Sequence, residues 1–246
     1  MVMAASLPAY ACSFQNGWAL ACNMTDFPFS IVGFDLDGTL CDTAADLGNA
    51  LNRTLEYAGR QTFPLDVVRR FIGGGSGQML RNALAESGGY DEAEFKPLQD
   101  RLFAYYGEAI AVHSRLYPGG AEMLDALAAR GVTVAVATNK REEFARQLLD
   151  ELGLSPRFAT IIGGDTLGPG KAKPAPDMLE EMIARCGGGR AAFVGDTTFD
   201  IGAARAAGLP VVAVSFGFHD LPPPLLGADA VIDHFDALVP TLTALG

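Results

Sequence analysis

The chain of 246 residues carries 29 acidic and 18 basic side chains, a formal net charge of -11, and 49% of its residues are apolar. This length suits one large domain, or a domain with an insertion, and allows a sizeable core. The acidic balance argues against a nucleic-acid partner because no basic stripe is present, but it leaves room for a small anionic substrate bound by a few cations or a metal. No apolar run approaches the roughly 18 residues of a membrane span.

The four cysteines, Cys12, Cys22, Cys41 and Cys186, show neither a CxxC pair nor the spacing of a Cys/His metal site. Reduced thiols are typical of cytoplasmic proteins, and we expect this chain to be cytoplasmic. Cys41 lies beside a group of acids, but no histidine belongs to the same motif. We therefore favour a packing role for Cys41 over a nucleophilic one.

Residues 1–24 differ in composition from the rest of the chain. They are rich in Ala, Ser and Cys and contain no Lys or Arg, and Gln15, Asn16 and Gly17 interrupt the only apolar run that resembles a secretory signal. We expect this stretch to be a disordered or non-native N-terminal tail, with Met24 as an alternative start.

The first predicted element is a buried strand at 31–34, with the sequence IVGF. A helical pattern then runs from 43 to 112, and Thr43 with Asp46 resembles a capping box at its start. Beyond it, helices alternate with strands, which we expect at 132–137, 159–164, 191–195, 211–216 and 230–233. This alternation predicts an α/β fold, a three-layer Rossmann-like core with a parallel sheet covered on both faces.

The helical block is predicted to be an all-helical cap domain at 44–114, inserted into an α/β core domain formed by 25–43 and 115–246. Within it lies the sequence GGGSG at 73–77. Gly74 and Gly75 could form a backbone cradle for an anion just before a helix, or a plain turn between helices, and the sequence leaves both readings open. No Gly-Lys-Ser/Thr follows, so this is not a Walker loop.

Polar side chains follow three of the predicted strands. They are Asp35 and Asp37, Thr138 and Asn139, and Asp196. Because the carboxyl ends of parallel strands meet at one edge of a sheet, we expect these groups to converge there. Asp200 lies four residues beyond Asp196, and Lys173, followed by a proline, is the expected counter-charge for a bound anion or for the carboxylates.

Acids grouped with a hydroxyl, an amide and one lysine suit phosphoryl transfer. Carboxylates and water are the ligands that Mg²⁺ prefers, and the metal offsets repulsion between an anionic nucleophile and a phosphate ester. An Asp such as Asp35 is ionised at neutral pH and can attack phosphorus without a base. Asp37, two residues on, could protonate the leaving alkoxide and then deprotonate the hydrolytic water.

These motifs resemble the haloacid dehalogenase (HAD) superfamily of phosphohydrolases. The sequence contains DxDGTLxDT, a strand-terminal Thr-Asn, a Lys-Pro before a helix and GDTTFD, in that order, over residues 31–232. The resemblance implies Asp35 as nucleophile, Asp37 as acid and base, and Thr138 with Asn139 as phosphate binders. It also implies Lys173 as charge clamp.

The same resemblance implies a Mg²⁺ ion held by Asp35, the backbone carbonyl of Asp37 and Asp196, with Asp200 in support. YPGG before a helix, TNK and KPAPDML are similar to the phosphoglycolate phosphatase branch of the superfamily. That branch implies a small phosphorylated metabolite as substrate, 2-phosphoglycolate first, hydrolysed through a phosphoaspartate. The assembly is expected to be a monomer or a homodimer.

Three other functions remain open at this point. A phosphomutase of the β-phosphoglucomutase type would pass the phosphoryl group to another hydroxyl of a sugar. Dehalogenation through Asp35 would need neither Asp37 nor a metal, so the acids argue against it. A non-enzymatic module resembling a receiver domain would carry a lasting phosphoaspartate, which Asp37 would shorten by promoting hydrolysis.

Overall fold

The computed structural model describes residues 27–246 and contains one six-stranded sheet in which all paired neighbours run parallel, in the order β5-β4-β1-β6-β7-β8. Strand β1 (Ile31–Phe34) is fully buried between β4 (Thr133–Ala137) and β6 (Ala191–Gly195), with Val32 opposite Val134 and Ala192. The outer strands are β5 (Ile161–Ile162), β7 (Val211–Val214) and β8 (Ala230–Ile232). The predicted α/β fold is confirmed; the predicted 1–24 tail lies outside the described residues.

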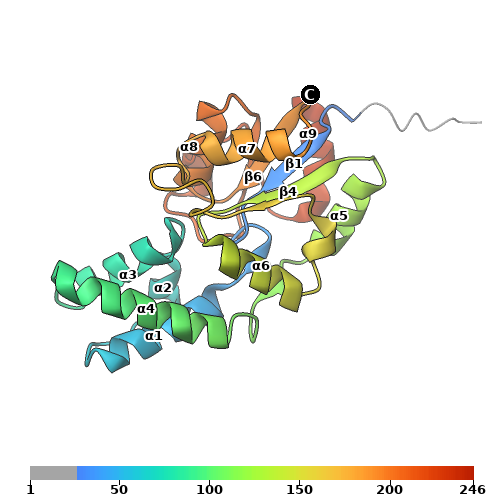
Figure 1. Ribbon diagram of the computed structural model, residues 1–246. Helices are drawn as coiled ribbons and strands as arrows, with labels where there is room; N and C mark the ends of the chain where they lie inside the picture. The colour runs from blue at the N-terminus through green and yellow to red at the C-terminus, as the bar shows by residue number, and fades with distance from the viewer. Residues whose placement is uncertain (1–26) are drawn as a thin grey trace, which may run out of the picture.

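Helices cover both faces of this sheet because successive side chains of a strand point in opposite directions. Val32 and Phe34 share one apolar cluster with α5 (Gly120–Ala128), α6 (Glu142–Glu151) and α9 (Leu238–Leu245). Ile31 belongs to a second cluster with α7 (Asp177–Arg185) and α8 (Thr198–Ala206). The result is the three-layer core seen in Figure 1.

A block of helices is inserted between β1 and β4 and lies beside the core in Figure 1. It consists of α1 (Ala44–Tyr57), α2 (Leu65–Arg69), α3 (Gly75–Glu86) and α4 (Glu92–Glu108). The chain enters and leaves it through β2 (Cys41–Asp42) and β3 (Arg115–Leu116), an antiparallel pair that the sequence did not predict. We call these helices the cap; the division of the chain at 44 and 114 stays a prediction.

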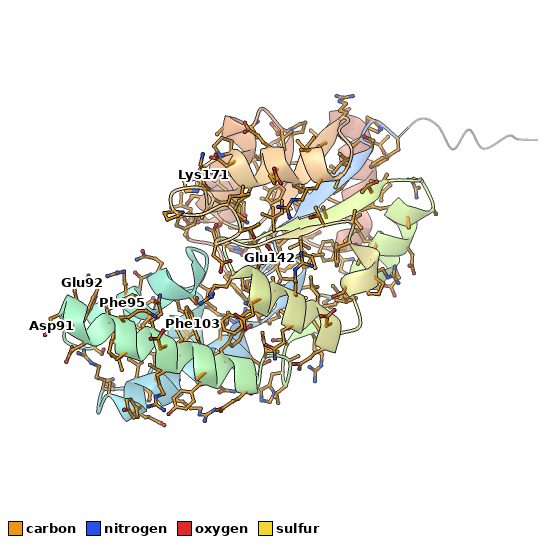
Figure 2. The ribbon with its side chains drawn as sticks, in the orientation of Figure 1. Asp91, Glu92, Phe95, Phe103, Glu142 and Lys171 are labelled. Atoms are coloured by element: carbon orange, nitrogen blue, oxygen red, sulfur yellow. The ribbon has the colours of Figure 1, made fainter. Side chains whose placement is uncertain are left out.

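The cap also packs on the core through aromatic side chains. Phe103 of α4 lies 5.5 Å from the ring of Phe144 on α6, and Figure 2 shows Phe103 on the side of α4 that faces the core. Gln147 of α6 donates a hydrogen bond to the carbonyl of Gly107 at 3.0 Å. No helix within residues 27–246 combines the length and hydrophobicity needed to cross a membrane.

The predicted capping box at Thr43 and Asp46 is wrong. Thr43 makes no capping hydrogen bond to α1 and instead donates to Asp37 at 2.7 Å. Asp46 is buried and accepts hydrogen bonds from the amides of His113 and Ser114 and from the Ser114 hydroxyl, the last two at 2.7 Å. The carboxylate ties the start of the cap to its exit, because three donors there satisfy a buried carboxylate more fully than one amide of the first helical turn would.

Replacing Asp46 should therefore loosen the junction between cap and core. We expect Asp46→Ala to lower the free energy of unfolding by about 3 kcal/mol, since buried donors lose a charged acceptor. Urea unfolding followed by circular dichroism measures this. Asp150→Ala, at an exposed carboxylate with no side-chain partner in the described structure, is the control and should unfold as the wild type does. Equal stability of all three proteins would contradict the assignment.

Candidate active site

The polar residues predicted to converge do lie together at the carboxyl end of the sheet. Asp35 follows β1, Thr138 follows β4 and Asp196 follows β6, and each of these three side chains is buried. The three strands are neighbours in the sheet, so their ends meet at one edge. A parallel sheet thus brings together groups that are far apart in the chain.

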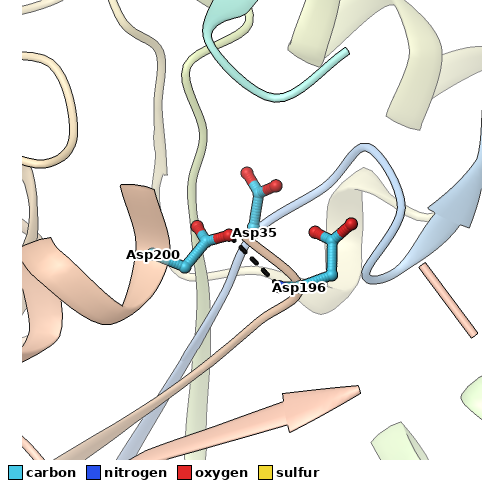
Figure 3. Close-up of side chains that lie close together, drawn as sticks. All are labelled: Asp35, Asp196 and Asp200. Carbon is cyan, nitrogen blue, oxygen red and sulfur yellow. Dashed lines mark hydrogen bonds between the residues drawn. The ribbon is translucent and has the colours of Figure 1, made fainter. Parts of the chain in front are cut away.

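Three carboxylates form the centre of the site. Asp35, Asp196 and Asp200 each place an oxygen within 4.8 Å of the others, and Figure 3 shows them close together at the strand ends. Their exposed fractions are 6%, 0% and 0%. Buried carboxylates at this spacing repel one another unless a cation lies among them, and hard oxygen donors of this kind suit a divalent cation. The residues present fit a metal site.

Lys173 supplies a positive charge to this group. Its Nζ lies 2.8 Å from Asp35 Oδ1 and 2.6 Å from Asp200 Oδ1, and the side chain is buried. Burial alone would lower the pKa of Lys173, but Asp200 and Asp35 outweigh it and the pKa is raised. The pKa of Asp35 is raised to about 6 by burial, against the opposing effect of Lys173. One lysine therefore neutralises only part of the carboxylate charge.

Asp196 is fixed by two donors and by close backbone packing. Thr39 Oγ1 donates to one oxygen at 2.9 Å and the amide of Phe218 to the other at 2.7 Å. Burial raises its pKa well above the usual range, with Asp200 and Asp35 adding to the effect. Gly38 has φ +84°, and a Cβ there would lie 2.3 Å from Asp196 Oδ2, so this turn requires glycine.

Asp200 connects the site to α8. One oxygen accepts hydrogen bonds from the amide and hydroxyl of Thr197, at 2.9 and 2.7 Å, completing a capping box at the start of the helix. The other oxygen accepts from Lys173. Asp200 therefore orients Lys173.

Asp37 is not part of this triad and instead pairs with a second lysine, Lys140, which was not among the predicted site residues. Lys140 Nζ lies 2.8 Å from both Asp37 oxygens, and the lysine is 5% exposed. Burial would lower the pKa of Lys140, but Asp37 and Tyr106 raise it overall. In the sequence, the position of Lys140 directly after Thr138 and Asn139, at the end of β4, was the feature that could have indicated a role in the site.

A cavity lies between this edge of the sheet and the cap. Asp35, Asp37, Thr138, Asn139 and Lys140 line it on the core side. The cap lines it mainly with apolar side chains and with the start of α3. The cap residues are Leu47, Ile72, Gly73, Gly75, Ser76, Met79 and Tyr106.

Of the two glycines predicted to cradle an anion, only Gly75 lines this cavity. Gly75 has φ +83°, and a Cβ there would lie 2.8 Å from the carbonyl oxygen of Asn139, so close packing also requires glycine at this position. Asn139 donates to the carbonyls of Gly73 and Lys173, at 3.3 and 3.1 Å, and joins the cap to the loop that carries the lysine.

Burial raises the pKa of Cys41 to about 12, so this thiol stays protonated and packs in the core.

Comparison with known proteins identifies the family. The family model described as haloacid dehalogenase-like hydrolase matches residues 32–214. This chain is a member of the haloacid dehalogenase-like hydrolases. Within that family it is 43% identical over 223 residues to a phosphoglycolate phosphatase of Agrobacterium fabrum, covering 89% of this chain and 95% of the relative. It is 41% identical to a phosphoglycolate phosphatase of Rhodospirillum rubrum, over 83% of this chain and 87% of that one.

Solved structures of this family have the same fold. A crystal structure of a predicted phosphoglycolate phosphatase from Haemophilus somnus 129pt superposes with a TM-score of 0.79 at 32% identity, covering 87% of this chain and 98% of that one. The structure of CbbY from Rhodobacter sphaeroides in complex with phosphate is similar in fold, with a TM-score of 0.72 at 23% identity, over 85% and 96% of the two chains. The HAD resemblance predicted from the motifs is confirmed.

The ion pairs of Lys173 generate a stability prediction. In a chelator at pH 8, Lys173→Met leaves Asp35 and Asp200 buried without their cation, and we expect the free energy of unfolding to fall by about 3–5 kcal/mol. Lys171→Met is the matched control, because Lys171 lies on the outer side of the same loop (Figure 2) and its exposed pair with Asp177 contributes little. Urea unfolding compares them, and equal losses would refute a special role for Lys173.

The raised pKa of Asp35 generates a pH prediction. Folding favours the neutral carboxyl of Asp35, so ionising this group lowers the free energy of unfolding. The loss is absent below the pKa of the unfolded chain, about 3.9, and is complete above the pKa of the folded protein, about 6. Asp35→Asn is neutral throughout. In metal-free protein, its stability relative to wild type should therefore increase by about 3 kcal/mol between pH 4 and pH 8. Unfolding curves at both pH values test this, and a difference independent of pH would contradict it.

Proposed function

We propose that the protein is a Mg²⁺-dependent phosphatase that hydrolyses 2-phosphoglycolate through a phosphoaspartate on Asp35. The observation that carries this proposal is the buried array of Asp35, Lys173 and Asp200, in which Asp35 also lines the cavity beneath the cap. The choice of substrate is supported by relatives 37–43% identical to this chain that are named phosphoglycolate phosphatases.

Mg²⁺ is the proposed cofactor. The carboxylates of Asp35 and Asp196 and the backbone carbonyl of Asp37 would hold it, with Asp200 in support, and the buried acid triad supports this assignment. The ion would supply positive charge that offsets the repulsion between the Asp35 carboxylate and the phosphate dianion.

In the first half of the reaction, a carboxylate oxygen of Asp35 attacks phosphorus and the bond to the glycolate oxygen breaks. Asp37 enters this step in its protonated form and donates the proton to that oxygen, which leaves as the hydroxyl of glycolate; Asp37 is left as a carboxylate. Asp37 lines the same cavity two residues from Asp35, which supports this role. We infer that Thr138, with Asn139, binds the phosphoryl oxygens and that Lys173 offsets their charge through its contact with Asp35.

In the second half, water attacks phosphorus of the phosphoaspartate. Asp37 takes a proton from that water, and cleavage of the bond between phosphorus and the Asp35 oxygen restores the carboxylate and releases inorganic phosphate. Asp35 is then again a free carboxylate and Asp37 is again protonated, so both acids are ready for another turnover. The cap above the cavity would restrict the water available to the site and limit the size of the ester.

Steady-state assays test the proposal. Wild-type protein with Mg²⁺ should release one phosphate and one glycolate per 2-phosphoglycolate, and a chelator should stop the reaction until Mg²⁺ is restored. We expect Asp35→Asn to lower kcat by more than about a thousandfold, since it removes the nucleophile. Asp150→Asn, at the exposed end of α6, should match wild type. Full turnover without metal, or by Asp35→Asn, would overturn the proposal.

A further inference from the structure

Two polar side chains of the cavity have no part in the chemistry described above. Lys140 follows β4 of the core and Tyr106 belongs to α4 of the cap, and both line the cavity. Lys140 is the one cationic side chain among the described residues that line it, and Tyr106 is the one phenol. They lie together, because Lys140 Nζ is 4.7 Å from the centre of the Tyr106 ring.

Lys140 retains capacity to bind a further anion. An ammonium group has three N–H bonds, and the contacts with the two Asp37 oxygens, each at 2.8 Å, use two of them. The positive charge lies over the electron-rich face of Tyr106, which stabilises it in this buried position. One lysine therefore joins Asp37 to the cap side of the cavity.

Tyr106 presents a buried donor without a partner. The side chain is 3% exposed. Its Oη makes no hydrogen bond of standard geometry in the described structure, and Lys140 is the side chain that acts on it most strongly. The ring is held edge-on against Phe144, with 5.4 Å between the ring centres. Burial raises the pKa of Tyr106, so the phenol keeps its proton and can donate. A buried hydroxyl that lacks a partner is costly and is often explained by a ligand.

Apart from Ser76 and the backbone at the start of α3, the remaining cap side of the cavity is apolar. Leu47, Ile72 and Met79 are apolar, as is Phe144 on the core side. A carboxylate brought into such surroundings beside Asp37 would be strongly disfavoured unless a cation and a donor met it. Lys140 and Tyr106 provide one of each at the same place.

We propose that Lys140 and Tyr106 form a subsite for the second anionic group, a carboxylate, of the phosphate ester. This inference rests on the proposed function and assigns selectivity within it. The third N–H of Lys140 and the Tyr106 hydroxyl donate to the carboxylate while the phosphate lies at Asp35. An ester that ends in a neutral hydroxymethyl group leaves both donors poorly satisfied and is discriminated against.

Tyr106→Phe tests the subsite because it removes one hydroxyl and keeps the ring against Phe144. The substrates are 2-phosphoglycolate and 2-hydroxyethyl phosphate, which differ at the carboxylate end. We expect the ratio of kcat/KM values, acid over alcohol, to fall by about tenfold or more, the loss typical of one hydrogen bond to a charged group. Tyr105→Phe is the matched control, because Tyr105 lines a different groove on the same helix, and its ratio should equal that of wild type.

Calorimetric binding to the Asp35→Asn protein separates this inference from the proposed function. In that background, Tyr106→Phe and Lys140→Met should each weaken binding of 2-phosphoglycolate at least about fivefold more than binding of 2-hydroxyethyl phosphate. Equal weakening of both ligands, or none, overturns the subsite even if wild type is an active phosphatase. Selective weakening supports the subsite even if turnover assays refute the proposed phosphatase.

Discussion

The contacts of buried Lys173 with Asp35 and Asp200 are the constraint on which the site depends. A parallel sheet gathers the ends of β1, β4 and β6, and the carboxylates there are removed from water. Removing charge from water is costly, so the array requires cations. Lys173 supplies one, and the acid triad retains enough negative charge to attract a divalent ion. The carboxylate charge that Lys173 leaves uncompensated is what makes this group of residues fit a divalent cation.

The cap depends on a second set of charges. Asp46 links the segment that enters the cap to the segment that leaves it. Asp37 accepts hydrogen bonds from Thr43, just before the cap, and from Lys140 in the core. Because Lys140 also faces Tyr106 of α4, the position of the cap is coupled to the acid that the proposed chemistry uses. The cap and the edge of the sheet are therefore joined at the site itself, and a substrate between them would contact both the cap and the core.

Much of this arrangement could be predicted from the sequence. The buried run at 31–34 and the alternation after residue 120 predicted the sheet, and parallel topology then required Asp35, Thr138 and Asp196 to meet. The two-residue strands β2 and β3 were missed because so short a segment has no periodicity. Tyr106 was missed because its helical spacing marks it as a core residue, and only tertiary structure reveals that its hydroxyl lacks a partner. Lys140 follows Thr138 and Asn139 directly in the chain, but only its burial and its pair with Asp37 show that it belongs to the site.

The central claim is that Asp35, held by Lys173, forms the covalent intermediate. Borohydride trapping during turnover of 2-phosphoglycolate tests it most directly, because reduction of an acyl phosphate converts that aspartate to homoserine. Peptide mass spectrometry should then locate homoserine at position 35 in quenched samples with substrate and Mg²⁺, and at no position in samples without substrate. Modification at Asp37 instead, or sustained turnover with no trapped residue at any quench time, would contradict the account.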